Sequence, residues 1–171
     1  HEHIKYFIEQ SDSKNVINDL NARKGELGFT GYHKDKSLEF NMIYTDMSVL
    51  IAPDNEKYRR LKDKCSAIDL NDLKSEMFVW REEGSATRLL FEKRYHETCG
   101  ESIHAIATIN NAEAIINLVS EGLGVSVMPQ LAADSIPESK KILIFKFEDD
   151  VFKREFYLVN RKNAILSPAA E

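Results

Sequence analysis

The sequence has little cysteine and no recognisable metal-binding pattern. Cys65 and Cys99 are its only thiols, lie far apart and form no Cys-x-x-Cys arrangement. Free thiols in a reducing cytosol are the simplest interpretation, and a disulfide is the alternative. The five histidines show no His-Glu-x-x-His or similar spacing. His1 and His3 could hold a metal loosely, or they could belong to a frayed end. Because no metal-ligand spacing is present, we expect neither a resident metal nor a cofactor.

Long apolar runs and a basic surface are also missing. No apolar run approaches the ~20 residues that a membrane-spanning helix requires, and no secretory signal is visible. We therefore expect a cytoplasmic protein with no membrane partner. The net charge is -5, and clustered lysines such as Lys140-Lys141 are accompanied by acidic residues. Such a chain is not expected to bind nucleic acid through its own surface.

Catalytic motifs are absent as well. The sequence contains no phosphate-binding P-loop and no convincing set of nucleophile, base and acid. His96 and His104 are lone histidines, which are usually structural or solvated. The sequence therefore predicts a protein that is not an enzyme.

What the sequence does contain is an alternation of strand-like and helix-like segments. Predicted strands cover residues 4–8, 27–30, 40–52, 77–80, 103–108, 125–128, 142–147 and 155–159. A first predicted helix follows Ser11-Asp12-Ser13 and ends at Gly25, and a second covers 56–64 and is followed by a helical turn at 70–73. Two more predicted helices run from Ser85 to about Cys99 and from a capping box at Asn110 to Gly122. Such alternation implies an α/β fold with a parallel sheet and helices on both faces.

Two of the predicted strands, 40–52 and 153–160, are long and lack neighbouring helices of the usual kind. We interpret them as crossings between two lobes, the first made of 1–47 and 160–171 and the second of 48–159. Ligands in open α/β sheets bind at the carboxyl ends of strands. Polar residues at those ends could therefore converge on a cleft between the lobes. They are Ser11, Ser13, Thr30, Gly31, Glu82 to Ser85 and Thr108 to Asn111.

One of these strand ends is suited to an anion. The run Trp80-Arg-Glu-Glu-Gly-Ser-Ala-Thr-Arg88 leads from a strand into a helix. Ser85 suits the N-cap position, and the preceding glycine lets the backbone approach a ligand. The unpaired N–H groups and the dipole of a helix start favour an anion, and Arg88 in the first turn indicates an anionic partner. The alternative is that Ser85 only caps the helix and that Arg88 pairs with Glu82 or Glu83.

Several motifs occur in an order and spacing that are hard to obtain by chance. The most specific is Gly122-Leu-Gly-Val-Ser-Val-Met-Pro129, in which Gly122 is expected to end a helix and Gly124 to permit close helix–strand packing. The run 80–88 contains an Arg-Glu-x-Gly-Ser-x-Thr-Arg pattern. Further motifs of this series are residues 21–31, residues 44–46 with 49–53, residues 154–162 and residues 166–170. Together they resemble the effector-binding domain of LysR-type transcriptional regulators over nearly the whole chain.

The resemblance implies a two-lobe α/β fold of the type 2 periplasmic-binding-protein class, with Rossmann-like mixed sheets joined by two crossover strands. It implies a small anionic effector between the lobes, and a homodimer or tetramer that contacts DNA only through a helix-turn-helix domain. Relative to that family, the sequence lacks the DNA-binding domain, the first strand and helix of the effector domain, and part of the closing helix.

Carried over position by position, the resemblance marks a set of candidate effector-binding residues. They are Ser11, Ser13, Thr30, Glu82, Ser85, Thr87, Thr108, Asn110 and Asn111. Hydroxyl, amide and backbone N–H donors of this kind capture carboxylate, sulfate or similar anions. Structural roles are the alternatives: a helix cap at Ser11, Ser13 or Asn110, a strand end at Thr30, and a salt bridge at Glu82.

The sequence therefore favours an effector-sensing regulatory domain, in which ligand binding shifts the lobes and the oligomer and so alters transcription. The alternative is a solute-binding protein of an ABC uptake system, which shares the two-lobe architecture. An upstream secretion signal would favour the uptake protein, and an upstream helix-turn-helix would favour the regulator. The motif at 122–129 favours the regulator.

Overall fold

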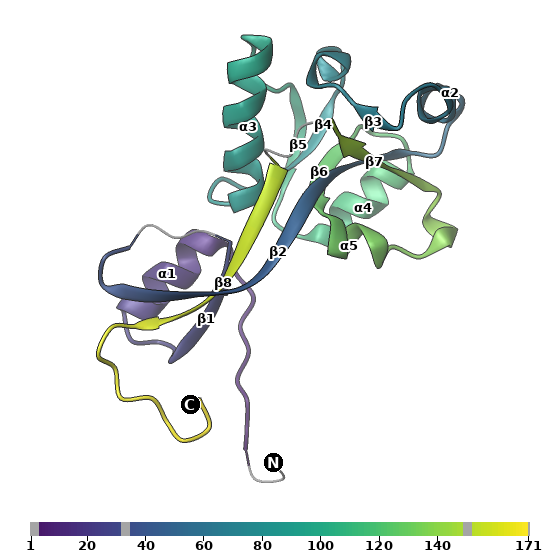
Figure 1. Ribbon diagram of the computed structural model, residues 1–171. Helices are drawn as coiled ribbons and strands as arrows, with labels where there is room; N and C mark the ends of the chain where they lie inside the picture. Colours follow the sequence, from purple (N-terminus) through teal and green to yellow (C-terminus); the bar gives the residue numbers. More distant parts are fainter. Residues whose placement is uncertain (1–3, 32–34, 149–151, 171) are drawn as a thin grey trace. The chain divides into compact units, whose positions relative to one another are not determined.

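The computed structural model describes residues 4–31, 35–148 and 152–170, and the chain divides into two compact units (Figure 1). Unit 1 comprises His1–Thr45 and Glu155–Glu171, and unit 2 comprises Asp46–Arg154. Both boundaries lie earlier in the chain than the sequence-based ones at 47/48 and 159/160. Strands β2 (Leu38–Pro53) and β8 (Lys153–Arg161) each contribute residues to both units.

Unit 1 is a small sheet with a helix on one face. Strand β1 (Leu27–Thr30) pairs antiparallel with β8, and β8 lies beside β2. Helix α1 (Ser13–Asn21) packs on this sheet through Ile17 and Leu20, which share a buried cluster with residues of β2 and β8. The predicted strand at 27–30 is confirmed, and so is a helix after Ser11-Asp12-Ser13. The predicted end of that helix at Gly25 is wrong, because α1 ends at Asn21 and Arg23 already has a φ of 60°.

Helix α1 begins at a different cap from the one expected. Asp12 is its N-cap, and the carboxylate accepts hydrogen bonds from the backbone N–H groups of Lys14 and Asn15, both at 2.9 Å. A carboxylate can accept both bonds and carries a full negative charge to the positive end of the helix, which neutral hydroxyls cannot do. The run Ser11-Asp12-Ser13 thus supplies the cap as predicted, but the narrower assignment to Ser11 or Ser13 is wrong.

The predicted strand over residues 4–8 is also wrong. Residues 4–12 form neither helix nor strand. The side chains of Tyr6, Phe7 and Ile8 are exposed by 68%, 94% and 89%. A strand requires backbone hydrogen bonds to a neighbouring strand, and no strand of the described residues pairs with this segment. The residue types favour a strand, but the pairing partner decides whether one forms.

The remaining elements belong to unit 2. They are α2 (Glu56–Lys64), β3 (Ala67–Ile68), η1 (Leu70–Leu73), β4 (Phe78–Arg81), α3 (Ala86–Cys99), β5 (Ala105–Ile109), α4 (Ala112–Ser120), β6 (Ser126–Pro129), α5 (Gln130–Asp134), η2 (Glu138–Lys140) and β7 (Ile142–Phe147). The pattern predicted all of these except β3, α5 and η2, and its bounds differ by one or two residues at several ends. Helix α5 starts directly after Pro129, the proline that ends β6.

The sheets of unit 2 are mixed. Strand β2 pairs antiparallel with both β6 and β7, whereas β3 is parallel to β7 and β4 is parallel to β5. An isolated bridge between Phe78 and Val125 links β4 to the segment before β6. The wholly parallel sheet inferred from the alternation of elements is therefore wrong, because β2 runs against its neighbours. The mixed sheets implied by the resemblance are present.

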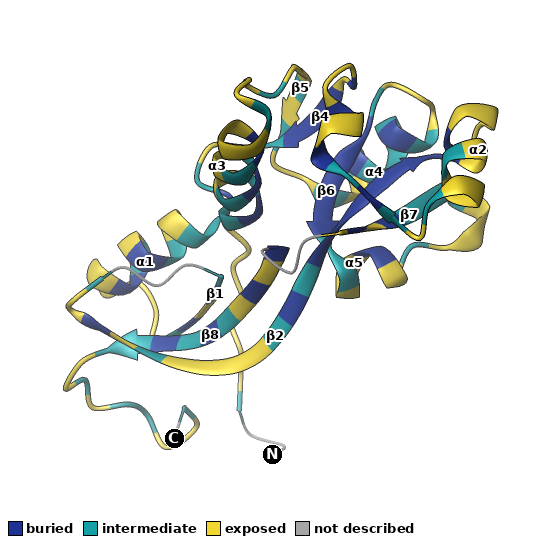
Figure 2. Ribbon diagram, turned by 45° about the horizontal axis from the view of Figure 1, so that its top comes forward, coloured by how far each residue is buried: buried dark blue, intermediate teal, exposed yellow. Residues whose placement is uncertain are grey.

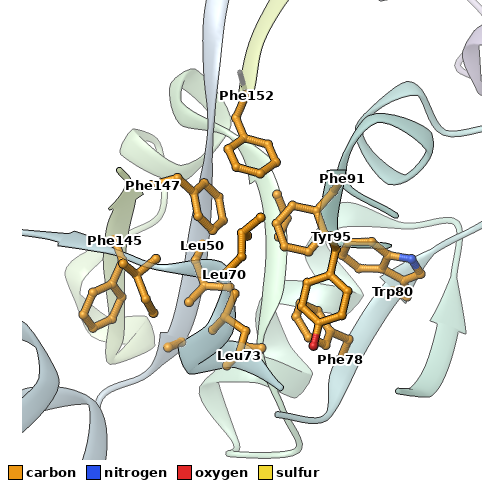
Figure 3. Close-up of a cluster of buried hydrophobic side chains, with 14 of the residues drawn as sticks. Leu50, Leu70, Leu73, Phe78, Trp80, Phe91, Tyr95, Phe145, Phe147 and Phe152 are labelled. Atoms are coloured by element: carbon orange, nitrogen blue, oxygen red, sulfur yellow. The ribbon is translucent and has the colours of Figure 1, made fainter. Parts of the chain in front are cut away.

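The core of unit 2 lies on both faces of β2. Leu50 and Ala52 join one buried cluster with residues of α3 and η1, and Val49 and Ile51 join a second cluster with residues of α4. Successive side chains of a strand point to opposite faces, so this part of β2 is buried on both sides (Figure 2). The first cluster is rich in aromatic rings (Figure 3). It includes Trp80, as expected from the sequence.

The motif at 122–129 has a structural role. Gly122 has a φ of 85°, and the following Leu123 N–H donates to the Leu118 carbonyl at 3.0 Å, which ends α4 in the usual way. A Cβ on Gly124 would lie 2.3 Å from the Met77 carbonyl oxygen. The expected need for close packing at Gly124 is thus present, but its neighbour is the backbone that leads into β4 rather than a helix.

The two cysteines are free thiols, and both are partly exposed. Burial is the main cause that raises the pKa of the Cys99 thiol. Because the thiolate is the reactive form, we expect Cys99 at pH 8 to react with iodoacetamide at least about threefold more slowly in the native protein than in urea. Peptide mass spectrometry over a time course measures this ratio. Equal rates in the two states would contradict the prediction.

Candidate functional site

The turn between β4 and α3 presents an uncapped helix start. Gly84 has a φ of 102°, a backbone conformation that side-chain-bearing residues rarely adopt. It turns the chain so that Ser85 becomes the N-cap of α3. Ser85 is only 5% exposed, and its side chain makes no capping hydrogen bond. Ser85 therefore takes the expected N-cap position without a capping bond from its side chain, and its contact with an effector stays a prediction. The first N–H groups of α3 are left without a side-chain cap and suit an anionic group.

A buried cation lies beside this helix start. Arg154, in β8, donates from Nη1 to Oγ1 of Thr87 at 2.5 Å, and the two residues are 8% and 5% exposed. Burial lowers the pKa of Arg154 to about 10; the carboxylate of Asp46 acts against this shift, and Arg81 adds to it. A pKa of about 10 still leaves the guanidinium charged at neutral pH. The first turn of α3 therefore faces a fixed positive charge.

Asp46, in β2, is held by backbone donors. Its Oδ1 accepts from the Met47 N–H at 2.8 Å, and its Oδ2 accepts from the Leu131 N–H at 3.1 Å. Asp46 is 8% exposed. These bonds satisfy both carboxylate oxygens and fix the negative charge in place near Arg154.

Arg88 is hydrogen-bonded to acceptors of unit 2. Its Nε donates to Glu92 at 2.9 Å, and its Nη1 donates to the Arg81 carbonyl at 2.7 Å. Trp80 donates to the same Glu92 oxygen at 2.8 Å. The pairing of Arg88 with Glu82 or Glu83 is therefore wrong, because its partner Glu92 lies one turn along its own helix. The anionic partner that the position of Arg88 indicates stays a prediction.

Glu82 forms a salt bridge with the adjacent Arg81. Arg81 donates to it through two nitrogens, each at 2.7 Å, and this bonding is the main cause that lowers the pKa of Glu82. The salt bridge named as the alternative for Glu82 is thus present. Contact of Glu82 with an effector stays a prediction.

The end of β5 lies next to the end of β4. The parallel register sets Thr108 opposite Trp80 and Ile109 opposite Arg81. The loops that follow, 82–85 and 110–111, therefore leave the same edge of the sheet. Thr108, Asn110 and Asn111 are exposed there.

The cap of helix α4 lies one residue later than predicted. The side chain of Asn111, rather than that of Asn110, accepts from the Ala114 N–H at 2.8 Å. Asn110 precedes the N-cap residue, so the predicted capping box begins one position too early.

In unit 1, the candidate residues gather where β1 ends. The Gly31 N–H donates to the Ser13 hydroxyl at 3.4 Å, which brings the start of α1 to the end of β1. Thr30 is buried at 3% exposure, and Ser11 is exposed. Effector contact by these residues stays a prediction.

Arg154 and Asp46 were missed by sequence reasoning as members of the site. Both were quoted within the motifs of the resemblance, and they are the last and first residues of unit 2. Charged residues within the predicted crossing strands 40–52 and 153–160 were the available signal. No group of His, Cys, Asp and Glu side chains in the described part of the chain could hold a metal ion. Nor does any helix among those residues have the length and apolar character needed to cross a membrane.

Comparison with known proteins places this fold in a family. The family model described as the LysR substrate binding domain matches residues 1–171. The chain belongs to this LysR family. A relative of the LysR domain is an HTH-type transcriptional regulator from Methanocaldococcus jannaschii, 32% identical over 95% of this chain and 54% of its own length. The RuBisCO operon transcriptional regulator of Allochromatium vinosum is 28% identical over 99% of this chain and 55% of its length. The LysR domain thus spans about half the length of these relatives.

Solved structures confirm the fold of the LysR domain. The effector-binding domain of QuiR in complex with shikimate matches with a TM-score of 0.80 and 22% identity, over 94% of this chain and 74% of that one. The regulatory domain of CcmR from Synechocystis PCC6803 in complex with 2-PG matches with a TM-score of 0.81 and 20% identity, over 94% and 75%. These likenesses establish the type 2 periplasmic-binding-protein-like architecture expected from the sequence.

Proposed function

We propose that this LysR domain senses a small anionic effector for a cytoplasmic transcriptional regulator that is not an enzyme. Effector binding shifts the equilibrium between conformations of a homodimer or tetramer, and the shift reaches DNA through a helix-turn-helix domain elsewhere in the protein. The named relatives, which are transcriptional regulators, support this function over solute uptake. The small molecules named with QuiR and CcmR support a ligand of similar size.

One observation carries the anionic character of the effector. The start of α3 has a buried N-cap serine that makes no capping bond, and the buried Thr87 hydroxyl beside it is held by a charged guanidinium. Backbone N–H groups, a hydroxyl and a positive charge in one place are the donors that bind carboxylates and phosphates. We propose that Ser85 and Thr87 contact the effector, with Thr108, Asn110 and Asn111 contributing from the adjacent strand end. Glu82 and the unit 1 residues Ser11, Ser13 and Thr30 remain further candidates.

The test is a ligand screen of the full-length regulator that contains this chain. Inorganic phosphate, sulfate, shikimate and 2-phosphoglycolate are added separately, and the melting temperature and small-angle scattering profile are recorded. We expect at least one of these anions to raise the melting temperature and to change the scattering profile, because a ligand that binds the folded state stabilises it. The absence of any response to the whole panel would overturn the proposed function.

Thr87→Val tests the site within this screen. Removing the hydroxyl deletes one hydrogen bond to an anion, so we expect about tenfold weaker binding of the best probe by calorimetry. Thr98→Val is the matched control, since Thr98 is an exposed threonine of the same helix, and its affinity should match the wild type. Equal affinities for the two variants would exclude Thr87 from the site.

A further inference from the structure

A buried serine of β2 has an unused hydroxyl. Ser48 is 3% exposed, and its hydroxyl has no hydrogen-bond partner among residues 4–31, 35–148 and 152–170. Buried hydroxyls are nearly always hydrogen-bonded, because a donor withdrawn from water loses a bond that the protein must replace. Ser126, in β6, is a second such serine: it is fully buried, and its hydroxyl likewise has no partner among the described residues. Each of these two hydroxyls is therefore an exception that requires an explanation.

The two serines point to opposite faces of the sheet that β2 and β6 form. Ser48 lies two residues before Leu50 in β2, and side chains two residues apart share a face of a strand. Leu50 belongs to the buried cluster that contains Phe91 of α3 (Figure 3). Ser126 is paired directly with Ile51, which belongs to the cluster with residues of α4. Ser48 therefore faces α3, whereas Ser126 faces α4.

The position of Ser48 along β2 places it near the first turn of α3. The next side chain on its face packs in the cluster of Phe91, as described above. The preceding side chain on that face is Asp46, whose carboxylate interacts with Arg154, and Arg154 donates to the Thr87 hydroxyl at 2.5 Å. Thr87 and Phe91 are one turn apart on α3. Ser48 thus lies between the strand residues that correspond to the first and second turns of this helix.

We propose that Ser48 is a further effector-binding residue, whose hydroxyl donates a hydrogen bond to an oxygen of the anion bound at the start of α3. Ser85 and Thr87 are buried to a similar degree, each at 5% exposure. Three hydroxyls then reach the anion, two from the helix start and one from the sheet against which α3 packs. Because the Ser48 hydroxyl has no protein acceptor to give up, its bond to the anion adds fully to affinity. This inference rests on the proposed function and adds a binding residue to its site.

The experiment compares Ser48→Ala with Ser126→Ala in the full-length regulator. Each change removes one buried hydroxyl that has no partner among the described residues, so Ser126→Ala is the matched control on the opposite face of the same sheet. Dissociation constants for inorganic phosphate, sulfate, shikimate and 2-phosphoglycolate are measured by calorimetry. Melting temperatures are recorded with and without each anion. Because alanine no longer buries an unpaired hydroxyl, we expect both variants without an anion to melt at or above the temperature of the wild type.

For whichever of the four anions the wild type binds most tightly, we expect Ser48→Ala to bind about tenfold more weakly and Ser126→Ala to stay within about twofold of the wild type. That anion should also raise the melting temperature of Ser48→Ala less than that of the other two proteins. Unchanged affinity in Ser48→Ala would overturn the inference and leave the proposed function standing. Equal losses in the two variants would overturn it too, since a general change in the sheet would explain them. If the wild type binds none of the four anions, the proposed function and this inference fall together.

Discussion

Gly124→Ala is expected to destabilise unit 2 by about 3 kcal/mol, at the upper end of the range for overpacked sites. The added Cβ would lie 2.3 Å from the Met77 carbonyl oxygen and 3.1 Å from its carbonyl carbon. Backbone atoms cannot turn aside as a flexible side chain can. The same oxygen accepts the Val125 N–H at 2.9 Å, so moving it would also break the link between β4 and the segment before β6. Urea unfolding measures the change.

Gly25→Ala is the matched control for this prediction. A Cβ on Gly25 would have its nearest neighbour at 3.8 Å, the Leu27 carbonyl oxygen, which is an ordinary contact. We expect a change within about 0.5 kcal/mol in either direction for this variant. Equal midpoints and slopes of unfolding for Gly124→Ala and the wild type would show that the backbone at Met77 can give way.

Local signals were sufficient for several elements of the fold. Helix α3 was predicted from the Gly-Ser turn before it to the glycine after it, and it spans Ala86–Cys99 with Gly100 at a φ of 71°. Helix α2 spans the predicted residues because Asn55 caps it and lysines complete its last turn. In both helices, the sequence within a few residues of each end carries the information.

Long-range pairing was not predictable in the same way. Residues 4–8 have the composition of a strand, yet they form none, since a strand depends on a partner elsewhere in the chain. The direction of β2 relative to β6 and β7 likewise depends on distant parts of the chain. Alternation of strands and helices indicates parallel pairing, but β2 runs in the direction opposite to β6 and β7, so these pairs are antiparallel.

The residues of the candidate site show the same difference between local and long-range signals. Ser85 and Thr87 were found because the turn and the helix start are adjacent in sequence. Arg154 was missed because its contact with Thr87 spans 67 residues, and the contact of Asp46 with Leu131 spans 85. Charged residues are almost never fully buried unless they are paired, so a sequence alone favours placing them in solvent. The expected pairing of Arg88 with Glu82 or Glu83 is wrong for the converse reason, since its partner Glu92 is one turn away on the same helix.

Phe91→Ala is expected to destabilise unit 2 by about 3–5 kcal/mol. Phe91 is fully buried, and its ring lies 5.3 Å from Phe152, 5.4 Å from Phe147 and 5.5 Å from Trp80 between centroids (Figure 3). Two more rings, those of Phe78 and Tyr95, lie within 6.0 Å. Truncation removes these ring contacts and leaves a cavity lined by rigid aromatic groups, which relax little to fill it. Thermal and urea unfolding give the change in free energy.

Leu89→Ala on the same helix is the control that separates the effect of losing buried surface from the effect of alanine on helix propensity. Leu89 is 50% exposed, so its truncation should cost less than about 1 kcal/mol, although both changes introduce the same alanine. Phe91 also lies one turn after Thr87 on the same face of α3, so its ring helps to hold the helix start in position. We therefore expect Phe91→Ala to weaken binding of the best anionic probe even at temperatures where the variant is folded, and Leu89→Ala to leave binding unchanged. Similar losses of stability in the two variants would mean that the aromatic cluster does not anchor α3.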